Sequence, residues 1–530
     1  MFIDFADANH SVPEEIDVCI VGAGVMALAM ASHLSAHSRR RILLVEEGDL
    51  VDTEAASSVP AEANSGDVHS AVASSRARGF GGSSRRWGGQ ALPFTPLDLS
   101  HRPFLPELDG WPVDWEELNR FYPAADRFLG LSPLPFDADL WRSEKVTAPF
   151  QHGRDLELMI SKYSPHPYLA SVHRRPIESS RQVDCLLHAK VASLGLDQDG
   201  RHVRKVRIRS PQGRETVLAA RVVVLCAGGI ENARILLASP QPGGCAIGNQ
   251  ADLVGRYYQD HVGFYAARLI PQDWGAFRHL FASFVPGNQK YLPKLQLSQA
   301  LQRRDGLLNV TGNLDVQEAD DSPRHSARKI FRTLLRRNRH GQDQRASFKD
   351  LWRLLRATPQ TLDLLTAHFI DHRIALPRKG RFFLMANAEC EPLHGSRITL
   401  GEQRDAYGLL RPVVKWLISD LTFQALQTYG HALKRSLEPA GIAMVELSPY
   451  LVDPSANWKE RAYSLYHHMG ATRMAASPSE GVVDGQGRVH GIDNLYIAGT
   501  SILPTGSASN PSYTALALAL RTADHVLNHS

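Results

Sequence analysis

Two stretches near the C-terminus hold side chains that can accept a proton and orient a hydroxyl group. Residues 466–474 contain His467 and His468, and the second stretch begins with Asn510 and Pro511. An imidazole has an ordinary pKa close to neutral, so it can take a proton from an alcohol. A carboxamide can hold the same hydroxyl but cannot accept its proton. His467 and Asn510 also have ordinary structural explanations: His467 could be a buried histidine in a turn, and Asn510 could be a helix N-cap.

The N-terminal region carries the pattern of a dinucleotide-binding unit. Three elements follow in the expected order: a strand over 16–21, a helix over 28–34 and a strand over 41–46. Gly22 allows the tight turn, Gly24 lets a pyrophosphate approach the backbone, and Ala27 replaces the third glycine. Glu46 ends the second strand, where an acid holds ribose hydroxyls. The pattern predicts a nucleotide site without separating FAD from NAD. The alternative is a glycine-rich turn in an unrelated α/β fold.

A second glycine-dense segment spans residues 78–89. Its glycines allow the backbone to lie against a ligand, and its hydroxyls can donate to phosphates. Phe80 and the apolar run that follows argue against the alternative of a polar surface linker. The residues expected to contact a cofactor here are Gly81, Gly82, Ser83, Ser84, Arg86 and Trp87.

Further strands are predicted over 183–191, 203–208 and 217–225. The last of them closes in Ala227 and Gly228, which suits a second nucleotide contact, and a helix begins at about residue 230. Strand-like alternation recurs over 396–400 and 412–416, and helical periodicity over 424–437 and 515–527.

Together these segments resemble the glucose–methanol–choline (GMC) oxidoreductases, whose second flavin-contact motif is a Gly-Gly-x-Ser stretch like 81–84. The resemblance implies an α/β fold: a Rossmann-like FAD-binding domain with an interleaved α+β substrate domain built on an antiparallel sheet. The expected FAD-binding segments are 14–100, 180–260 and 462–530. The expected substrate-domain segments are 101–179 and 261–461.

The resemblance also implies roles for particular residues. His467 matches the family's active-site histidine and would act as general base, while hydride passes to flavin N5 and Asn510 positions the hydroxyl. Arg86 stands where some members carry a histidine bonded to the flavin, so FAD is expected to be non-covalent. The remaining cofactor contacts implied are Val191, Ala227, Gly228, Gly499, Thr500, Ser501, Pro511 and Tyr513.

The expected substrate is an alcohol on a sugar, glycoside or biosynthetic intermediate. The variants at 87–89 and 228–234 resemble bacterial sugar- and polyol-oxidising branches most closely. The expected electron acceptor is O2, a quinone or a carrier. One alternative is an NAD(P)H-dependent reductase or monooxygenase, although no second nucleotide pattern is found. The other is a flavin-containing binding or scaffold protein.

Composition places limits on these readings. A chain of 530 residues with 43% hydrophobic and 22% charged residues is typical of a globular protein with two domains, or with one large domain that carries a lobe grown from its loops. The net charge of +4 gives no indication of nucleic acid binding. Five scattered cysteines, no predicted metal site, no secretory signal and no long apolar run favour a cytoplasmic location.

One segment departs from the family pattern. An expected basic helical insert over about 322–372 has eleven Lys or Arg and two Asp between Arg324 and Arg356, a local net charge of +9. Two solvated helices explain it most simply. The alternative is a surface for an anionic partner or a membrane.

Overall fold

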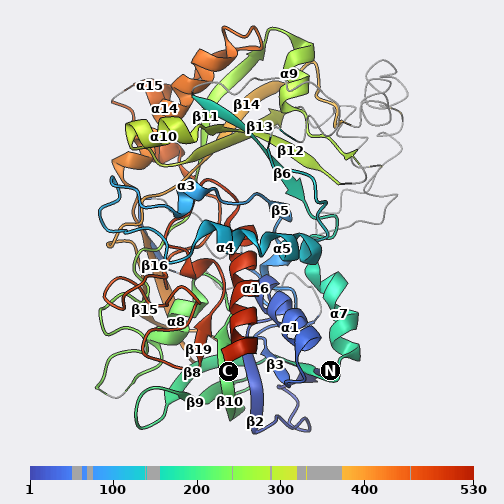
Figure 1. Ribbon diagram of the computed structural model, residues 1–530, viewed down its shortest axis with the longest axis vertical. Coiled ribbons are helices and arrows are strands. Elements are labelled where there is room, and N and C mark those ends of the chain that lie inside the picture. Colours follow the sequence, from blue (N-terminus) through green and yellow to red (C-terminus); the bar gives the residue numbers. More distant parts are fainter. Residues whose placement is uncertain are drawn as a thin grey trace.

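The computed structural model describes residues 1–50, 63–67, 76–137, 155–241, 243–286, 289–318, 373–453 and 455–529, and the single residues 139, 330 and 352. Two large sheets divide the chain (Figure 1). The first sheet lies in the lower half of the view together with both termini, and the second sheet lies in the upper half. This arrangement confirms the predicted fold class.

The first sheet has the strand order β1–β7–β3–β2–β10–β9–β8, with β19 beside β10. From β1 to β10, and at β19, neighbouring strands are parallel, whereas β9 and β8 join antiparallel. All of β3 is buried, as expected for a parallel strand covered on both faces. The strands are β1 Phe2–Asp4, β2 Glu15–Val21, β3 Ile42–Val45, β7 Val183–Leu187, β8 Lys190–Leu196, β9 Val203–Arg209, β10 Glu215–Leu225 and β19 Leu495–Ile497.

The single strand predicted over 183–191 is wrong, because the structure has two strands there. β7 ends at Leu187, and β8 begins at Lys190. Between them His188 has a φ of 53°, a left-handed conformation that breaks an extended strand. Apolar residues on both sides of the break hide it from a periodicity argument.

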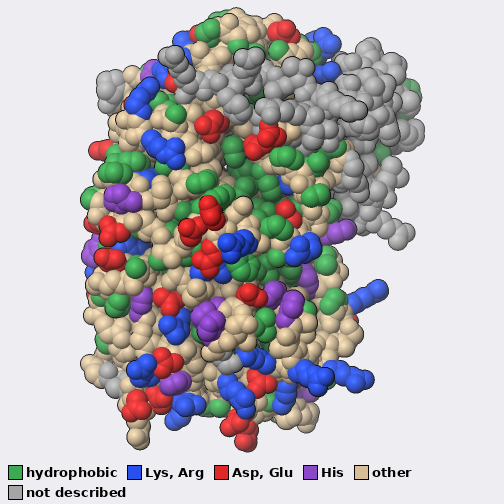
Figure 2. All heavy atoms as spheres, viewed as in Figure 1, with side chains coloured by type: hydrophobic (Ala, Val, Ile, Leu, Met, Phe, Trp, Pro, Cys, Tyr) green, Lys and Arg blue, Asp and Glu red, His purple; other side chains and the backbone are tan. Residues whose placement is uncertain are grey.

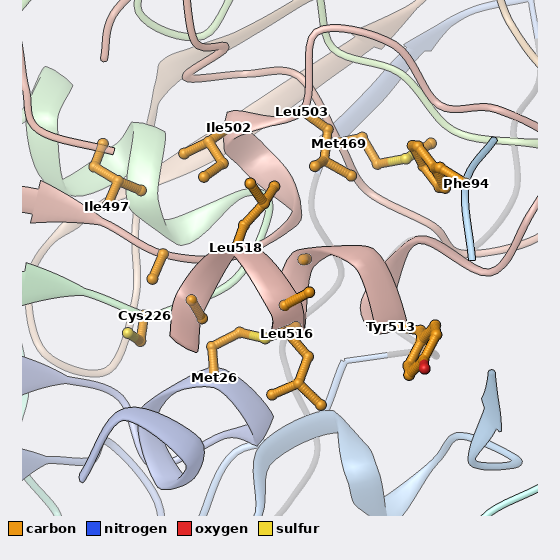
Figure 3. Close-up of a cluster of buried hydrophobic side chains, with 14 of the residues drawn as sticks. Met26, Phe94, Cys226, Met469, Ile497, Ile502, Leu503, Tyr513, Leu516 and Leu518 are labelled. Atoms are coloured by element: carbon orange, nitrogen blue, oxygen red, sulfur yellow. The ribbon is translucent and has the colours of Figure 1, made fainter. Parts of the chain in front are cut away.

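Two helices, α1 (Val25–His37) and α16 (Pro511–His529), pack against each other beside the first sheet. Figure 3 shows the apolar cluster around them, in which Met26 of α1 and Leu516 and Leu518 of α16 lie near Cys226 and Ile497. This contact joins the two ends of the chain. The glycine turn before α1 and the start of α16 are thereby held in one place.

The second sheet has the order β17–β11–β14–β13–β12–β6–β5, with β18 beside β11. Its pairings are antiparallel, and α14 (Asp420–Leu437) covers one face. The strands are β5 Gln90–Ala91, β6 Leu156–Tyr163, β11 Val262–Pro271, β12 Tyr291–Leu297, β13 Val310–Gln317, β14 Arg381–Ala388, β17 Ala443–Leu447 and β18 Tyr463–Ser464.

A third, three-stranded sheet holds β15 (Arg397–Arg404), β16 (Leu410–Trp416) and β4 (Ala63–Gly66). The sequence resemblance placed 396–416 with the substrate-domain sheet, but these strands do not join it. They pack against α8 (Glu231–Leu237) on the side of the first sheet.

Short helices connect the sheets. α5 and α4 pack against α16, and α7 packs against β7, although all three lie in the range 101–179 that was expected to belong to the substrate domain. The helices are α3 Pro96–Leu99, α4 Trp115–Asn119, α5 Tyr122–Leu129, α7 Leu169–Ser179, α9 Trp274–Phe281, α10 Gln299–Asp305 and α15 Pro449–Val452.

The expected basic insert lies outside the described residues, except for Ile330 and Trp352. Among the described helices, none combines the length and apolar character needed to cross a bilayer. On the face shown in Figure 2, positive and negative side chains are interspersed over the lower half, in keeping with the small net charge.

Candidate active site

A cavity lies where β2, β3, β10 and β19 end, at the carboxyl edge of the first sheet. Gly22 leaves β2 with a φ of 102°, and a Cβ there would lie 2.8 Å from the Cys226 carbonyl oxygen. Gly24 then caps α1, whose first turn has no acidic side chain. The first backbone N–H groups of this helix therefore form a site for an anionic group such as a pyrophosphate.

Glu46 lines the same cavity from the end of β3. Its carboxylate accepts hydrogen bonds from the backbone N–H groups of Ala23 (2.8 Å), Gly48 (2.9 Å) and Gly79 (2.7 Å). A carboxylate has about four acceptor positions, so one remains for a ligand hydroxyl. The acid therefore braces the glycine turn and can still bind one ribose hydroxyl.

The segment 76–89 is only partly turned toward the cavity. Gly82 and Ser83 line it, and a Cβ on Gly82 would lie 2.8 Å from the Cα of Gly24. The other predicted contacts of this segment do not line the cavity. Buried Gly81 precedes the 3-10 turn η2 (Gly82–Arg85), the Ser84 hydroxyl donates to the Gly81 carbonyl, Trp87 donates to the Pro167 carbonyl, and Arg86 is exposed.

The remaining predicted cofactor residues divide in the same way. Those that line the cavity are Val191, Ala227, Gly228, Gly499, Thr500 and Pro511. Three do not. Ala27 is buried in α1, and the Ser501 hydroxyl bonds to Asn232 and Thr472. The Tyr513 hydroxyl donates to Asp126 at 2.6 Å. Ala27, Ser501 and Tyr513 are therefore placed by packing and internal hydrogen bonds.

Charged residues at one end of the cavity were missed by the sequence analysis. The Lys190 ammonium bonds to Glu47 (3.2 Å) and Asp405 (2.8 Å), and Arg76 pairs with Glu231 (3.3 Å). These ions raise the pKa of Lys190 and hold the pKa of Glu231 well below its usual range, although burial opposes both changes. They come from five distant segments, so no local pattern could have revealed them.

His467 lines the cavity and is held from two sides. Its backbone N–H donates to Asp260 at 2.7 Å, and the same carboxylate oxygen accepts from the backbone N–H of His261, also at 2.7 Å. The two imidazoles meet at Nδ1, 2.8 Å apart, and Nε2 of His261 lies 3.0 Å from the Gly506 carbonyl oxygen. His261 stands 206 positions from its partner and was not predicted.

Both imidazoles are held in the neutral form. Burial, followed by the nearby positive charges, lowers the pKa of His467 well below its ordinary value. Burial lowers the pKa of His261 to about 4, while it raises the pKa of Asp260 to about 6. At neutral pH the His467 ring is therefore available to accept a proton.

His468 also lines the cavity, but its ring bonds to Tyr258 and not to the His261–His467 pair. Its Nδ1 lies 2.7 Å from the Tyr258 hydroxyl, and its carbonyl oxygen accepts from the Thr500 hydroxyl at 2.6 Å. Burial lowers its pKa to about 3. Its role is to tie the histidine segment to Thr500, at the point where the chain has returned to the cavity.

Asn510 directly precedes α16, and its side-chain oxygen is buried without a hydrogen-bond partner among the described residues. Asn510 is not among the residues that line the cavity. A buried amide oxygen is normally hydrogen-bonded, so this one is suited to a ligand donor.

The fold and this cavity together define a dinucleotide-binding α/β protein with a neutral histidine at one end of the ligand site.

Comparison with known proteins agrees with this class. The family model described as GMC oxidoreductase matches residues 392–519. Fructose dehydrogenase large subunit of Gluconobacter japonicus is 22% identical over 499 residues, covering 85% of this chain and 80% of that one. C-glycoside 3-oxidase of Microbacterium trichothecenolyticum is 23% identical over 472 residues, covering 84% and 74%.

The fold comparison gives the same result. The crystal structure of pyridoxine 4-oxidase from Mesorbium loti superposes with a TM-score of 0.56 and 18% identity, covering 97% of this chain and all of that one. The chain is similar to the GMC oxidoreductase family, whose model matches its C-terminal part, as the sequence motifs indicated. It is an FAD-dependent oxidoreductase that acts on CH–OH groups, FAD being the cofactor typical of this family.

The residues at the cavity fit FAD. Gly22 lets the turn pass close to the Cys226 carbonyl, where a Cβ would collide, and the start of α1 then suits the pyrophosphate. Glu46 keeps one acceptor position for a ribose hydroxyl.

Proposed function

We propose that this enzyme oxidises a hydroxyl group of a sugar or related polyol to a carbonyl, with His467 as general base and Asn510 as the positioning residue. The substrate class is supported by relatives named for fructose and C-glycosides. O2, a quinone or an electron carrier would then take the electrons.

The observation that carries the proposal is the pair of hydrogen bonds on His261. A carbonyl oxygen only accepts, so Nε2 of neutral His261 must carry the hydrogen that points to Gly506. Nδ1 of His261 is then an acceptor, and the hydrogen between the rings must belong to Nδ1 of His467. The Nε2 atom of His467 therefore has a free lone pair, which is the form that a general base requires.

The chemistry follows from this tautomer. Nε2 of His467 takes the hydroxyl proton, and the Asn510 carboxamide holds the oxygen from which that proton leaves. Bound FAD supplies the acceptor for the hydride that leaves the carbinol carbon. Burial lowers the pKa of both rings and keeps them neutral until the proton arrives.

Replacing the base tests the proposal. His467→Ala is expected to retain its yellow cofactor but to slow anaerobic flavin reduction by a sugar and alcohol panel about 10²–10⁴-fold, through loss of a general base. His431→Ala, which changes an exposed histidine on α14, is the matched control and should react at the wild-type rate. Stopped-flow absorbance measures both. A His467 variant reduced as fast as the control would refute the assignment, and a wild-type flavin that no alcohol reduces would favour a binding protein.

We also propose that FAD is bound without a covalent link. The described cavity residues of the segment 76–89 are Arg76, Ala77, Arg78, Gly82 and Ser83, and none of these side chains forms the known links to flavin. Acid precipitation of the holoenzyme should release all of its FAD into the supernatant. Flavin absorbance retained in a washed, denatured pellet would contradict this.

A further inference from the structure

A row of polar side chains crosses the middle of the second sheet. Gln296 of β12 stands opposite Thr311 of β13, which stands opposite Asn387 of β14. Lys294 lies two residues before Gln296 on the same strand, so its side chain is on the same face. We name Lys294, Gln296 and Asn387 the polar row.

The polar row points away from α14. The other face of the sheet packs on that helix, since the Tyr429 hydroxyl donates to the Leu295 carbonyl at 2.9 Å and a Cβ on Gly312 would collide with the Tyr429 ring. Asn387, on the opposite face, donates to the Ala508 carbonyl at 2.9 Å. The polar row therefore faces the segment that ends in Asn510.

Three amide atoms of this row are buried without a hydrogen-bond partner among the described residues. Gln296 is 0% exposed, and neither its amide nitrogen nor its amide oxygen has a hydrogen-bond partner in the part of the chain that the structure describes. Asn387 is 5% exposed, and its amide oxygen is equally unpartnered. Buried polar groups are normally satisfied, so this pattern indicates a ligand surface.

Lys294 is the unusual member. It is 3% exposed, and no residue in the described ranges gives its ammonium a hydrogen bond or an ion pair. The neighbouring strand provides a contrast, because the buried Lys162 ammonium donates to the Ser132 carbonyl at 2.9 Å and lies 3.7 Å from the centre of the Phe136 ring. The Lys294 charge also helps to lower the pKa of His467 and of His261, so it lies close to the proposed base.

We propose that the substrate is a polyol with an anionic oxygen group, a carboxylate or a phosphoryl group, and that this group pairs with Lys294. Gln296 and Asn387 bond its hydroxyls beside His467. This inference rests on the proposed function. A neutral polyol would leave the ammonium buried without a counter-ion, which is costly, whereas an anionic substrate brings the counter-ion with it.

The test compares neutral and anionic donors of matched shape. Anaerobic flavin reduction of the holoenzyme is measured with D-glucose against D-glucuronate and D-glucose 6-phosphate, and with D-glucitol against D-gluconate. The wild type should have a second-order rate constant at least about tenfold higher for a carboxylate or a phosphate donor. Lys294→Met should remove that preference, because the rate constant for the anionic donors should fall at least about tenfold more than the rate constant for the matched neutral donors. The carboxylate and phosphate arms identify which anion the site takes.

Lys162→Met is the control for removing a buried ammonium from this sheet, and it should keep the preference. Loss of a buried unpaired charge rarely harms folding, so Lys294→Met is expected to fold, and Lys294→Gln provides a second variant. A wild type that prefers the neutral donors, or a Lys294→Met that loses neutral and anionic donors equally, overturns the proposal.

A second measurement separates the two proposals. Titration of the oxidised His467→Ala holoenzyme, whose flavin these donors should reduce only slowly, with D-gluconate and with D-glucose 6-phosphate should perturb the flavin absorbance. The dissociation constant should rise at least about tenfold when Lys294→Met is added. Anion binding that depends on Lys294, without any flavin reduction in the wild type, would support the anion site and contradict the proposed function. Flavin reduction by neutral alcohols alone, without anion binding that depends on Lys294, would support the proposed function and contradict the anion site.

Discussion

The two sides of the active site are built in different ways. The cofactor cavity is formed largely by backbone at the ends of parallel strands, where glycines at 22, 24, 82 and 228 leave room for a ligand. The polar row on the second sheet uses side chains brought together by strand register. Backbone recognition depends on short local motifs, whereas side-chain recognition depends on which strands are neighbours.

His467 stands where the two sides meet. The element after it returns to the first sheet, and its partner His261 begins the strand region of β11 in the second sheet. Asp260 and His261, which directly precede β11, therefore hold the backbone of the base and set its tautomer.

The largest predicted effect is the loss of bound FAD from the cofactor cavity, with the second sheet left unchanged. Gly22→Ala should yield protein without bound FAD, because the new Cβ meets the Cys226 carbonyl at 2.8 Å and the residue has a φ of 102°. The ratio of flavin to protein absorbance after purification measures this. Gly200→Ala is the control, since Gly200 also has a positive φ, of 71°, but has nothing within 4 Å of a new Cβ. A Gly22→Ala protein with full flavin content would show that the tight turn is not required.

A smaller effect is expected at the junction. His261→Phe removes the acceptor for the Nδ1 hydrogen of His467, so flavin reduction should slow about 10–100-fold, which is less than the loss of about 10²–10⁴-fold expected when the general base itself is removed. His261→Gln keeps an acceptor oxygen and should recover part of the rate.

The readout specific to this role is the tautomer itself. In ¹⁵N-labelled wild-type protein, the His467 ring should carry its hydrogen on Nδ1. In His261→Phe the ring should be a mixture of the Nδ1–H and Nε2–H tautomers. An unchanged tautomer alongside a slow variant would assign His261 a purely structural role.

The smallest predicted effect is a pH dependence that Lys294 imposes on anionic donors. Burial lowers the pKa of Lys294 to about 8, so its ammonium is charged below that pH and neutral above it. The kcat/KM for D-gluconate should fall about tenfold per pH unit above about 8, while the value for D-glucitol stays level. On the acid side neither donor should lose rate near pH 6.5, because the pKa of His467 lies well below that value. Equal alkaline losses for both donors would argue against an anion contact.

Much of the cavity could be predicted from local sequence motifs. The strand–glycine–helix order around Gly22, the acid at Glu46 and the Ala227–Gly228 turn each depend on a few neighbouring residues, and all of them reach the cavity. Trp87, Ser84 and Tyr513 lie in equally suggestive segments but are turned into internal contacts. Sequence spacing specifies that a segment is near the ligand, and packing decides which of its side chains face it.

The amino-acid sequence by itself predicted the resemblance to the GMC family, the glycine turns at the cavity and the histidine segment, because each depends on short-range geometry that a glycine, proline or strand end imposes. Only the tertiary structure decided the His261–His467 pair, the ion cluster around Lys190 and the burial of Lys294 without an ion pair to any described residue. These features join residues that are far apart in the chain, and the strand order of two sheets sets the distance between such residues.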